Sequence, residues 1–282
     1  MTPLDTTAVP TSAPTVGVIG GSGLYSLLDP HRSETLEVPT PYGPTSSPIT
    51  IGELAGVHVA FLARHGTAHT LPPHRVPYRA NVWAMASLGV CAIVSSSAVG
   101  SLSSHIAPGT FVVPDQLIDR TWGRADTFFD GDDVQHLPFS DPYSARLRTI
   151  ATDALTRLGE TAHPSGTTVV IQGPRFSTRA ESRWYRSLGG HIVNMTQYPE
   201  AALAAELNLG LVNLSFVTDS DAGDTADDAV DPSIVLRRMA DAEPRIRSAI
   251  AAIAGAVPRD YAVPARMSDD AVRRVLSAGA LV

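Results

Sequence analysis

Short runs of branched apolar residues recur along the chain, and stretches with helical periodicity separate several of them. Short runs rich in Val and Ile are typical of strands that are buried on both faces of a sheet. Alternation of such strands with helices favours an α/β fold with a mixed, mostly parallel sheet. The runs cover residues 16–19, 57–63, 90–94, 111–113, 167–171, 191–193 and 211–217.

Helical patterns complete this expectation, since apolar residues recur at helical spacing or follow a first-turn proline. The predicted helices cover residues 81–88, 144–158, 182–188, 199–207, 233–254 and 269–276. No internal repeat and no linker divides the chain. We therefore expect a disordered tail at residues 1–15 and a single domain at residues 16–258, whose central sheet is partly barrel-like and flanked by helices. A C-terminal extension, helical in our prediction, follows at residues 259–282.

The composition excludes several classes of function. All 21 basic residues are arginine, which excludes Schiff-base chemistry and the phosphate-binding P-loop, because both need lysine. A net charge of -7 argues against a surface that binds nucleic acid or an anionic membrane. Cys91 is the only cysteine, so an intrachain disulfide and a cysteine-rich zinc site are impossible. No apolar run approaches the roughly 18 residues of a membrane span, and the N-terminus lacks a signal-peptide pattern, so we expect a cytoplasmic protein.

Three of the predicted strands end in residues that can bind an anion. Gly20–Gly23 offers flexible backbone N–H groups and the Ser22 hydroxyl. Arg64 and His65 offer a guanidinium and an imidazole, and Ser95–Ser97 offers hydroxyls. Each group alone has a simpler interpretation, as a structural turn, a surface ion pair or a polar turn. Together they favour a phosphate site, because ligands in open α/β sheets bind beyond the carboxyl ends of the strands.

The stretch Asn213–Asp224, NLSFVTDSDAGD, raises the question of why an apolar run should end in two aspartates. Asp and Gly are common in surface turns, which is the simpler interpretation. The alternative is a buried strand that delivers the carboxyl groups of Asp219 and Asp221 into a pocket. In an extended chain, these two side chains face the same side.

Seven motifs together resemble the methylthioadenosine phosphorylase branch of the purine nucleoside phosphorylase family. In order they are VIGGSGLY, LARHGTAH, SSSAVGSL, DQLIDRTW, GPRFSTRAES, NMTQYPEAALAAEL and VTDSDAGD. The resemblance covers roughly residues 16–255, and RHG, GPRFSTRAE and NMTQYPE are specific in combination. It implies a pentosyltransferase that cleaves the N-glycosidic bond of a purine nucleoside. Inorganic phosphate is the co-substrate, and the resemblance implies no cofactor and no metal.

The resemblance also implies roles for individual residues. Met195, with Thr196, corresponds to the floor beneath the sugar, and Phe176 corresponds to the aromatic ring that packs on the purine. Ser177 lies at a position associated with choosing among substrates. Outside this context, Met195 and Phe176 would be taken as ordinary core residues. The phosphate site maps onto Ser22, Arg64, His65, Ser97, Ala98 and Thr196.

Asp219 matches the base-binding carboxyl group of the family, and this gives the two aspartates a function. As the glycosidic bond breaks, negative charge grows on the purine, and a proton supplied to N7 makes the base a better leaving group. Burial and a second carboxylate both raise the pKa of a carboxyl group, so Asp219 can hold a proton near neutral pH. Asp221 is expected to be its partner and to accept a hydrogen bond from the 6-amino group. The catalytic pair therefore favours adenine.

An apolar pocket at the 5′ end of the sugar is also implied, where it would take a methylthio group. Its expected residues are Pro232, Val235 and Leu236, with His136 from a neighbouring subunit. Because His136 would cross an interface, we expect a homotrimer, and pairing into a hexamer stays open. The alternative for His136 is a loop histidine that is merely solvated. The expected reaction is phosphorolysis of S-methyl-5′-thioadenosine to adenine and 5-methylthioribose 1-phosphate, in purine and methionine salvage.

Other functions remain as alternatives. Within the family, the substrate could be a 6-oxopurine nucleoside or methylthioinosine. In another class, VIGGSG suggests a Rossmann-type dehydrogenase or nucleotide-binding protein, but its GxGxxG fingerprint is broken and it leaves the two aspartates unexplained. A serine hydrolase is disfavoured because GxSxG is missing. A binding protein without activity is a further alternative, although every main site residue is chemically competent.

Overall fold

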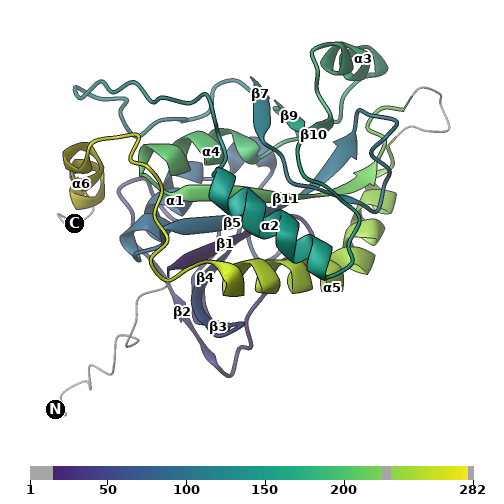
Figure 1. Cartoon of the computed structure of the whole chain (residues 1–282). Coiled ribbons are helices and arrows are strands. Elements are labelled where there is room, and N and C mark those ends of the chain that lie inside the picture. The colour runs from purple at the N-terminus through teal and green to yellow at the C-terminus, as the bar shows by residue number, and fades with distance from the viewer. Residues whose placement is uncertain (1–14, 224–229, 279–282) are drawn as a thin grey trace.

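The computed structural model describes residues 15–223 and 230–278, and a mixed sheet runs through the centre of this part of the chain (Figure 1). Its strands are β1 (Val16–Gly20), β2 (Ser33–Leu36), β3 (Ile49–Leu54), β4 (Val57–Ala63), β5 (Ala92–Ser101), β6 (Phe111–Val112), β7 (Gln116–Arg120), β8 (Ala162–His163), β9 (Thr167–Ile171), β10 (Ile192–Asn194) and β11 (Gly210–Asp219). The helices are α1 (Tyr78–Ser87), α2 (Ala145–Arg157), α3 (Arg179–Ser187), α4 (Gln197–Glu206), α5 (Pro232–Ala256) and α6 (Asp269–Ser277), with a short 3₁₀ turn at Pro73–Arg75.

Strand β5 is the point at which the sheet branches. Along most of its length β5 pairs in parallel with β11, and its first residues also pair in parallel with β1. Its last residues, Gly100 and Ser101, pair antiparallel with β10. The main path runs β2-β3-β4-β1-β5-β10-β9-β7, while β11, β6 and β8 form a second arm. The α/β fold with a mixed sheet is confirmed.

Helices cover both faces of the sheet, and each face has its own apolar core (Figure 1). Because successive side chains of a strand point to opposite faces, Val18 and Val94 belong to one core and their neighbours Ile19 and Ile93 to the other. Helices α2 and α5 cover the first face, and α1, α4 and α6 contribute to the second core.

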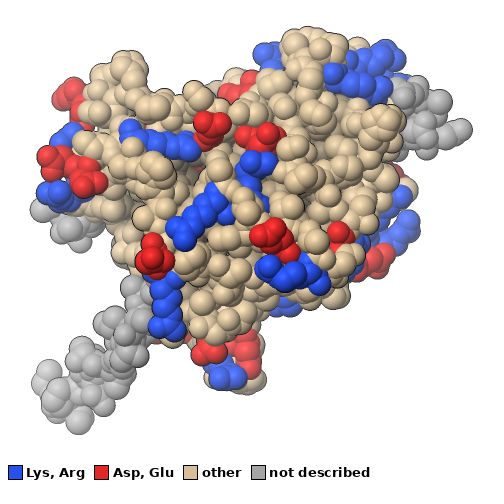
Figure 2. Space-filling model, in the orientation of Figure 1, with Lys and Arg blue, Asp and Glu red and all other residues tan. Residues whose placement is uncertain are grey.

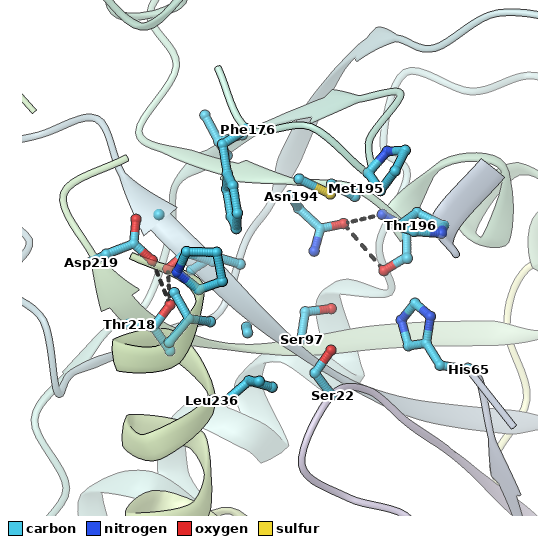
Figure 3. A pocket seen from close by; sticks show the side chains of 18 of the residues that line it. Ser22, His65, Ser97, Phe176, Asn194, Met195, Thr196, Thr218, Asp219 and Leu236 are labelled. Atoms are coloured by element: carbon cyan, nitrogen blue, oxygen red, sulfur yellow. Dashed lines mark hydrogen bonds between the residues drawn. The ribbon is translucent and has the colours of Figure 1, made fainter. Parts of the chain in front are cut away.

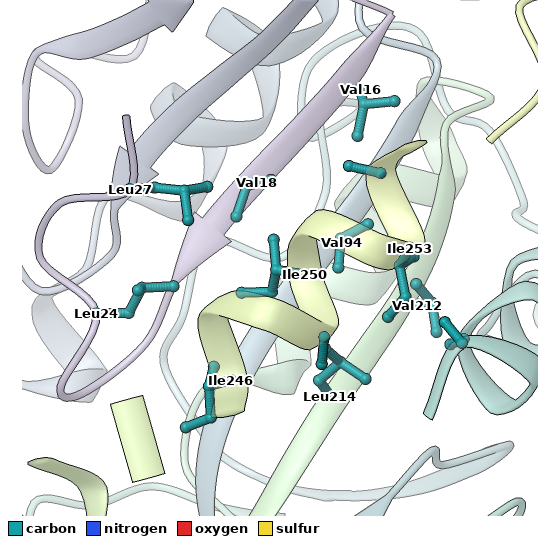
Figure 4. Close-up of a cluster of buried hydrophobic side chains, with 14 of the residues drawn as sticks. Val16, Val18, Leu24, Leu27, Val94, Val212, Leu214, Ile246, Ile250 and Ile253 are labelled. Atoms are coloured by element: carbon teal, nitrogen blue, oxygen red, sulfur yellow. The ribbon is translucent and has the colours of Figure 1, made fainter. Parts of the chain in front are cut away.

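Helix α5 presents an apolar stripe to the first core. Ile246, Ile250 and Ile253 lie four and three residues apart, which places them on one side of a helix. Figure 4 shows these three side chains pointing toward the strands that carry Val94 and Leu214. The stripe fixes α5 against the sheet, so the start of the helix is held at the carboxyl ends of the central strands.

The predicted strand at residues 90–94 ended too early, because β5 continues through three buried serines to Ser101. Their hydroxyl oxygens all accept hydrogen bonds inside the protein. Ser96 Oγ accepts from Gly21 N at 3.1 Å, and Ser95 and Ser97 accept from the Asn213 amide at 2.8 and 3.0 Å. A hydroxyl can be buried at little cost when it is hydrogen-bonded. The serines therefore belong to the strand and not to a turn after it.

Strands β2, β3, β7 and β8 were not predicted from the sequence. They are short or interrupted by polar residues, as in Gln116–Arg120, so they lack the apolar runs that indicated the other strands. Residues 39–48 and 128–142 contain neither helix nor strand.

The C-terminal segment packs on its own chain. Tyr261 is buried and its hydroxyl lies 2.7 Å from Ser144 Oγ, while Trp83 Nε1 donates to the Val275 carbonyl at 3.0 Å. The expected tail, Thr15 excepted, and residues 279–282 lie outside the described residues. The division into tail, domain and extension stays a prediction.

The face seen in Figure 2 carries acidic and basic side chains close to one another, separated by large uncharged areas. Within the described ranges, no helix combines the length and the hydropathy that a membrane crossing requires.

Candidate active site

A cavity of about 280 Å³ opens where the central strands end. Parallel strands bring their carboxyl ends to one edge of a sheet, so residues far apart in the sequence meet there. Figure 3 shows Phe176 and Asp219 toward one end of the cavity and Ser22, Ser97 and His65 toward the other. The predicted site residues that line it are Ser22, Arg64, His65, Ser97, Ala98, Phe176, Met195, Thr196, Asp219, Asp221, Pro232, Val235 and Leu236.

Arg64, which follows β4, forms a buried ion pair that the sequence did not reveal. Its Nε and one terminal nitrogen donate to the two carboxylate oxygens of Glu200 at 2.7 and 2.9 Å, and the other terminal nitrogen donates to Ser96 O at 2.9 Å. The Arg64 and Glu200 side chains are only 1% and 2% exposed. A bidentate pair of this kind fixes the plane of the guanidinium. The alternative of a surface ion pair is therefore wrong, and Glu200, the last residue of NMTQYPE, is the missed partner.

His65 is buried beside Arg64 and is held in one orientation. Its Nδ1 lies 2.8 Å from the Leu71 carbonyl, which can only accept, so Nδ1 carries the proton. Burial, together with the positive charge of Arg64, lowers the pKa of His65 to about 4. His65 is therefore neutral at physiological pH, with Nε2 as its free ring nitrogen. The His69 ring, which also lines the cavity, lies 4.9 Å away between centroids.

The glycine-rich turn after β1 packs tightly against β5. A Cβ at Gly21 would lie 2.3 Å from Ser96 O, so only glycine fits there. The Gly21 N–H donates to Ser96 Oγ and is not available to an anion. The expected nest of backbone N–H groups is thus reduced, and Ser22 is the residue of this turn that faces the cavity (Figure 3).

Asn194 holds the loop that carries Met195 and Thr196. Its Oδ1 accepts hydrogen bonds from Thr196 N at 2.6 Å and from Gln197 N at 2.7 Å. On the other side, Arg124 donates to the Met195 carbonyl at 3.0 Å. These contacts place Met195 and Thr196 at the wall of the cavity. Asn194 was missed, although it opens the motif NMTQYPE.

Asp219 and Asp221 are joined by a backbone hydrogen bond across a turn, which the sequence did not indicate. Strand β11 ends at Asp219, and Asp221 adopts a φ of 50° in the following turn, so the expected extended chain is wrong. The Asp221 N–H turns back to donate to Asp219 Oδ1 at 2.8 Å. Gly100 makes room for the pair, because a Cβ there would lie 2.8 Å from Asp219 Oδ1. Both aspartates are buried and line the cavity, which excludes the surface turn.

The Asp219 carboxyl group has a pKa raised to about 6, mainly because it is buried. Hydrogen bonds from the Thr218 hydroxyl, at 2.7 Å, and from the Asp221 N–H oppose this shift, while the charge of Asp221 adds to it. Burial also raises the pKa of Asp221. The hydroxyls of Ser182 and Ser177 oppose this shift, although neither forms a hydrogen bond of good geometry with the buried Asp221 Oδ2. This oxygen therefore keeps the capacity to accept from a ligand donor.

Phe176 reaches the cavity from the loop before α3, which is firmly anchored. Thr178 caps α3 by accepting from Glu181 N at 3.1 Å, and Glu181 accepts from Thr178 N at 2.8 Å. Arg175 binds the Glu181 carboxylate through both of its terminal nitrogens, at 2.8 and 2.7 Å. Ser177 does not line the cavity. Within the described part of the chain its buried Oγ forms no hydrogen bond of good geometry, but the hydroxyl lies beside the Asp221 carboxyl group and lowers the pKa of that group.

The start of α5 closes the cavity only in part. Pro232, Val235 and Leu236 line it, but the Leu236 side chain is 53% exposed. His136 is exposed and does not line the cavity. Its loop is held beside α6, where Asp133 pairs with Arg274 at 2.6 Å. The role predicted for His136, in the site of a neighbouring subunit, stays a prediction.

The further lining residues were not predicted from the sequence. Most are small or apolar residues of the same motifs, whose direction only the fold decides. They are His69, Pro73, Val99, Gly100, Pro174, Val193, Asn194 and Thr218. Within residues 15–223 and 230–278, no group of three or more His, Cys, Asp or Glu side chains is arranged to hold a metal ion.

The chain is similar to known proteins over most of its length. The family model described as "Phosphorylase superfamily" matches residues 15–278. S-methyl-5′-thioadenosine phosphorylase of Mycolicibacterium smegmatis is 53% identical over 208 residues, 74% of this chain and 78% of the relative. Purine nucleoside phosphorylase of Streptomyces coelicolor is 45% identical over 251 residues, 86% of this chain and 89% of the relative. The structure of methylthioadenosine phosphorylase from Schistosoma mansoni in complex with adenine superposes with a TM-score of 0.85 at 32% identity, covering 94% of this chain and 98% of that one.

Proposed function

Because the chain belongs to the phosphorylase superfamily, we propose that its cavity is the active site of a nucleoside phosphorylase that acts on S-methyl-5′-thioadenosine. The protein is a pentosyltransferase that converts this nucleoside and phosphate to adenine and 5-methylthioribose 1-phosphate, a step of purine salvage. Relatives of that name, 53% and 48% identical to this chain, support the substrate. The observation that carries the proposal is the buried Asp219–Asp221 pair facing a cavity whose other end holds Arg64 and His65.

At one end of the cavity, phosphate is held for attack on the anomeric carbon. Ser22, Ser97 and Thr196 offer hydroxyls, and Ala98 contributes backbone. Arg64 keeps two N–H groups beyond the three that are bonded to Glu200 and Ser96. Donors that are already oriented gain from positioning and stabilise charge without reorganising during the reaction. Phosphate is a co-substrate, and the reaction needs neither a cofactor nor a metal.

At the other end, Asp219 supplies the proton that the leaving purine needs. A pKa near 6 keeps a useful fraction of this carboxyl protonated close to neutral pH. Asp221 Oδ2, a buried acceptor in the cavity wall, accepts from the 6-amino group of adenine. Phe176 packs on the purine and Met195 lies beneath the sugar. Ser177 acts through its buried hydroxyl, which lies beside the Asp221 carboxyl group and lowers its pKa.

The apolar wall of Pro232, Val235 and Leu236 takes the methylthio group. Because Leu236 is half exposed in one chain, we propose that a neighbouring subunit completes this wall and contributes His136. A homotrimer satisfies this geometry, and pairing of trimers into a hexamer is compatible with it. Residence in the cytoplasm agrees with a chain that has a single cysteine.

A second candidate is phosphorolysis of 6-oxopurine nucleosides or of methylthioinosine. It is favoured by the 45% identity to a relative named purine nucleoside phosphorylase. An oxygen in place of the 6-amino group would face the carboxylate of Asp221 without a proton to share, so this candidate is the weaker one.

The decisive experiment follows release of free base by the purified protein. Methylthioadenosine, adenosine and inosine are offered in turn, each with and without phosphate. We expect adenine release that depends on phosphate and is fastest from methylthioadenosine. Hypoxanthine as the only product would favour the second candidate, and no release from any of the three would refute a phosphorylase acting on these nucleosides.

A further inference from the structure

The buried amide of Asn213 lies behind the phosphate end of the cavity, and the mechanism above does not use it. Asn213 is in β11 and is fully buried. Its Nδ2 group donates one hydrogen bond to Ser95 Oγ at 2.8 Å and another to Ser97 Oγ at 3.0 Å. Of these two serines, only Ser97 lines the cavity.

Other buried donors hold the amide oxygen of Asn213. Oδ1 accepts from Gln197 Nε2 at 3.0 Å and from Ser215 Oγ at 2.7 Å. Gln197 is in turn held by the Tyr143 hydroxyl, which donates to Gln197 Oε1. All four residues of this network are buried. With its oxygen held in this way, the amide nitrogen of Asn213 points toward the two serines.

The bond from Asn213 decides what the Ser97 hydroxyl can do. A hydroxyl has one proton to donate and two lone pairs that accept. Because Ser97 Oγ accepts from Asn213, one lone pair is used inside the protein and the proton is left for another direction. Figure 3 shows the Ser97 side chain at the cavity near Ser22 and His65. An anion in that place presents mainly acceptors, and a donated proton is what it needs.

We propose that Asn213 is a positioning residue for phosphate, which sets Ser97 as a hydrogen-bond donor toward the anion. The inference rests on the proposed function, in which phosphate is the co-substrate. In a chain without lysine, the direction of each hydroxyl at this end matters for how phosphate is held.

The variant Asn213→Asp tests the direction in which the Ser97 hydroxyl donates, because Asp and Asn side chains have nearly the same shape. The carboxylate replaces the donating NH₂ group with an acceptor, so the Ser97 proton turns toward residue 213 and away from the cavity. We expect the KM for phosphate to rise about tenfold or more, as for loss of a hydrogen bond to a charged group. The KM for methylthioadenosine should stay within about twofold. An unchanged phosphate KM, or an equal rise in both KM values, would overturn the proposal.

A double-mutant cycle separates the hydroxyl from the added charge. Ser97→Ala by itself removes the donor and raises the phosphate KM. If Asn213 acts through Ser97, adding Asn213→Asp to Ser97→Ala changes the phosphate KM little further. If the second substitution has its full effect in the absence of the hydroxyl, the carboxylate repels phosphate directly and the proposal is wrong.

A third variant covers the case in which a buried carboxylate prevents folding. Asn213→Ser removes both amide donors without adding charge, and we expect a rise of about threefold in the phosphate KM. Ser95→Ala is the matched control, because it removes the other partner of the same amide but lies outside the cavity lining. An equal effect of Ser95→Ala would mean general disturbance of the network and would overturn the proposal. Base release that is independent of phosphate in the wild type would instead refute the proposed function.

Discussion

The two ends of the cavity differ in how the protein holds their polar side chains. At the phosphate end, the strong polar groups are bound to protein partners: Arg64 to Glu200, His65 to the Leu71 carbonyl and Ser97 to Asn213. At the nucleoside end, Asp221 Oδ2 forms no hydrogen bond of good geometry within the described residues, and Leu236 is half exposed. At the first end the protein therefore holds the donors in place before a ligand arrives, and at the second a buried acceptor and an apolar wall are left open.

This difference suggests how the work of binding is divided. An end whose donors are fixed loses little entropy and needs little reorganisation when phosphate enters. An end with a buried carboxyl group of raised pKa and an open apolar wall is stabilised by the nucleoside itself, or by a second chain. Substitutions at the two ends should therefore affect different quantities: stability and the KM for phosphate at the first, and catalysis and substrate choice at the second.

The largest effect is expected for Asp219→Asn at the nucleoside end. Without an acidic proton for N7, kcat/KM for methylthioadenosine should fall by about 10²- to 10⁴-fold, the usual contribution of general acid catalysis. Cleavage of inosine should fall much less, and the KM for phosphate should change little. The measurement is steady-state base release with each nucleoside. Equal losses on adenine and hypoxanthine nucleosides would contradict the role given to Asp219.

Glu200→Gln removes the ion pair with Arg64 at the phosphate end. Removing the partner leaves the buried charge of Arg64 uncompensated, which should lower the free energy of unfolding by about 3 to 5 kcal/mol. Phosphate should restore part of this loss, because the anion supplies a new partner and binds only the folded state. Denaturant unfolding with and without phosphate measures both effects. The control is Asp133→Asn, which breaks an exposed ion pair with Arg274 and should cost about 1 kcal/mol or less.

The third prediction concerns how the free energy of unfolding depends on pH in the wild type and in Asp219→Asn. The pKa of Asp219 is raised to about 6 in the folded protein, from about 4 in an unfolded chain. The folded state therefore binds this proton more tightly, and its contribution to stability is present below about pH 4 and is lost as the pH rises through 6. Relative to Asp219→Asn, the wild type should lose about 2 kcal/mol between pH 4 and pH 8. A difference between the two proteins that does not vary with pH would mean that Asp219 titrates normally.

The smallest effect is expected at the open wall. Leu236→Ser should lower kcat/KM for methylthioadenosine about fivefold and leave adenosine nearly unchanged, because only part of an apolar contact is removed. Leu158→Ser is the matched control, since Leu158 is 44% exposed at the end of α2 and away from the cavity. A fall of equal size for adenosine would show that Leu236 does not contact the methylthio group.

Much of the fold could be predicted, because a strand buried on both faces requires an apolar run. β4 and β9 have the predicted bounds. The end of β5 could not be predicted in this way, because hydrogen bonds there replace apolar contacts. Its serines belong to a strand since Asn213 and Gly21 donate to their hydroxyl oxygens. The edge strand β2 was not predicted, because a half-exposed strand needs few apolar residues and so leaves no apolar run in the sequence.

In the site, local residue types were predictable and pairings were not. Arg64 and Asp219 were found because each follows an apolar run. Their partners are set by the fold: Glu200 lies 136 residues from Arg64 in the sequence. Asp221 was assigned to the right place for the wrong reason, because a turn with positive φ, and not strand periodicity, brings it beside Asp219.

The pairing of Arg64 with Glu200 also bears on how readily the product leaves. In the proposed reaction, the sugar phosphate keeps its phosphate group at the end of the cavity where Arg64 and His65 lie. Since Glu200 neutralises Arg64 and His65 is uncharged at neutral pH, a dianion there is held by oriented N–H and O–H dipoles more than by net charge. Attraction by dipoles acts at contact and fades quickly with distance, whereas the attraction of a net charge extends over several ångströms. Once the product has moved a short way, little draws it back, and the site is suited to rapid turnover more than to tight retention.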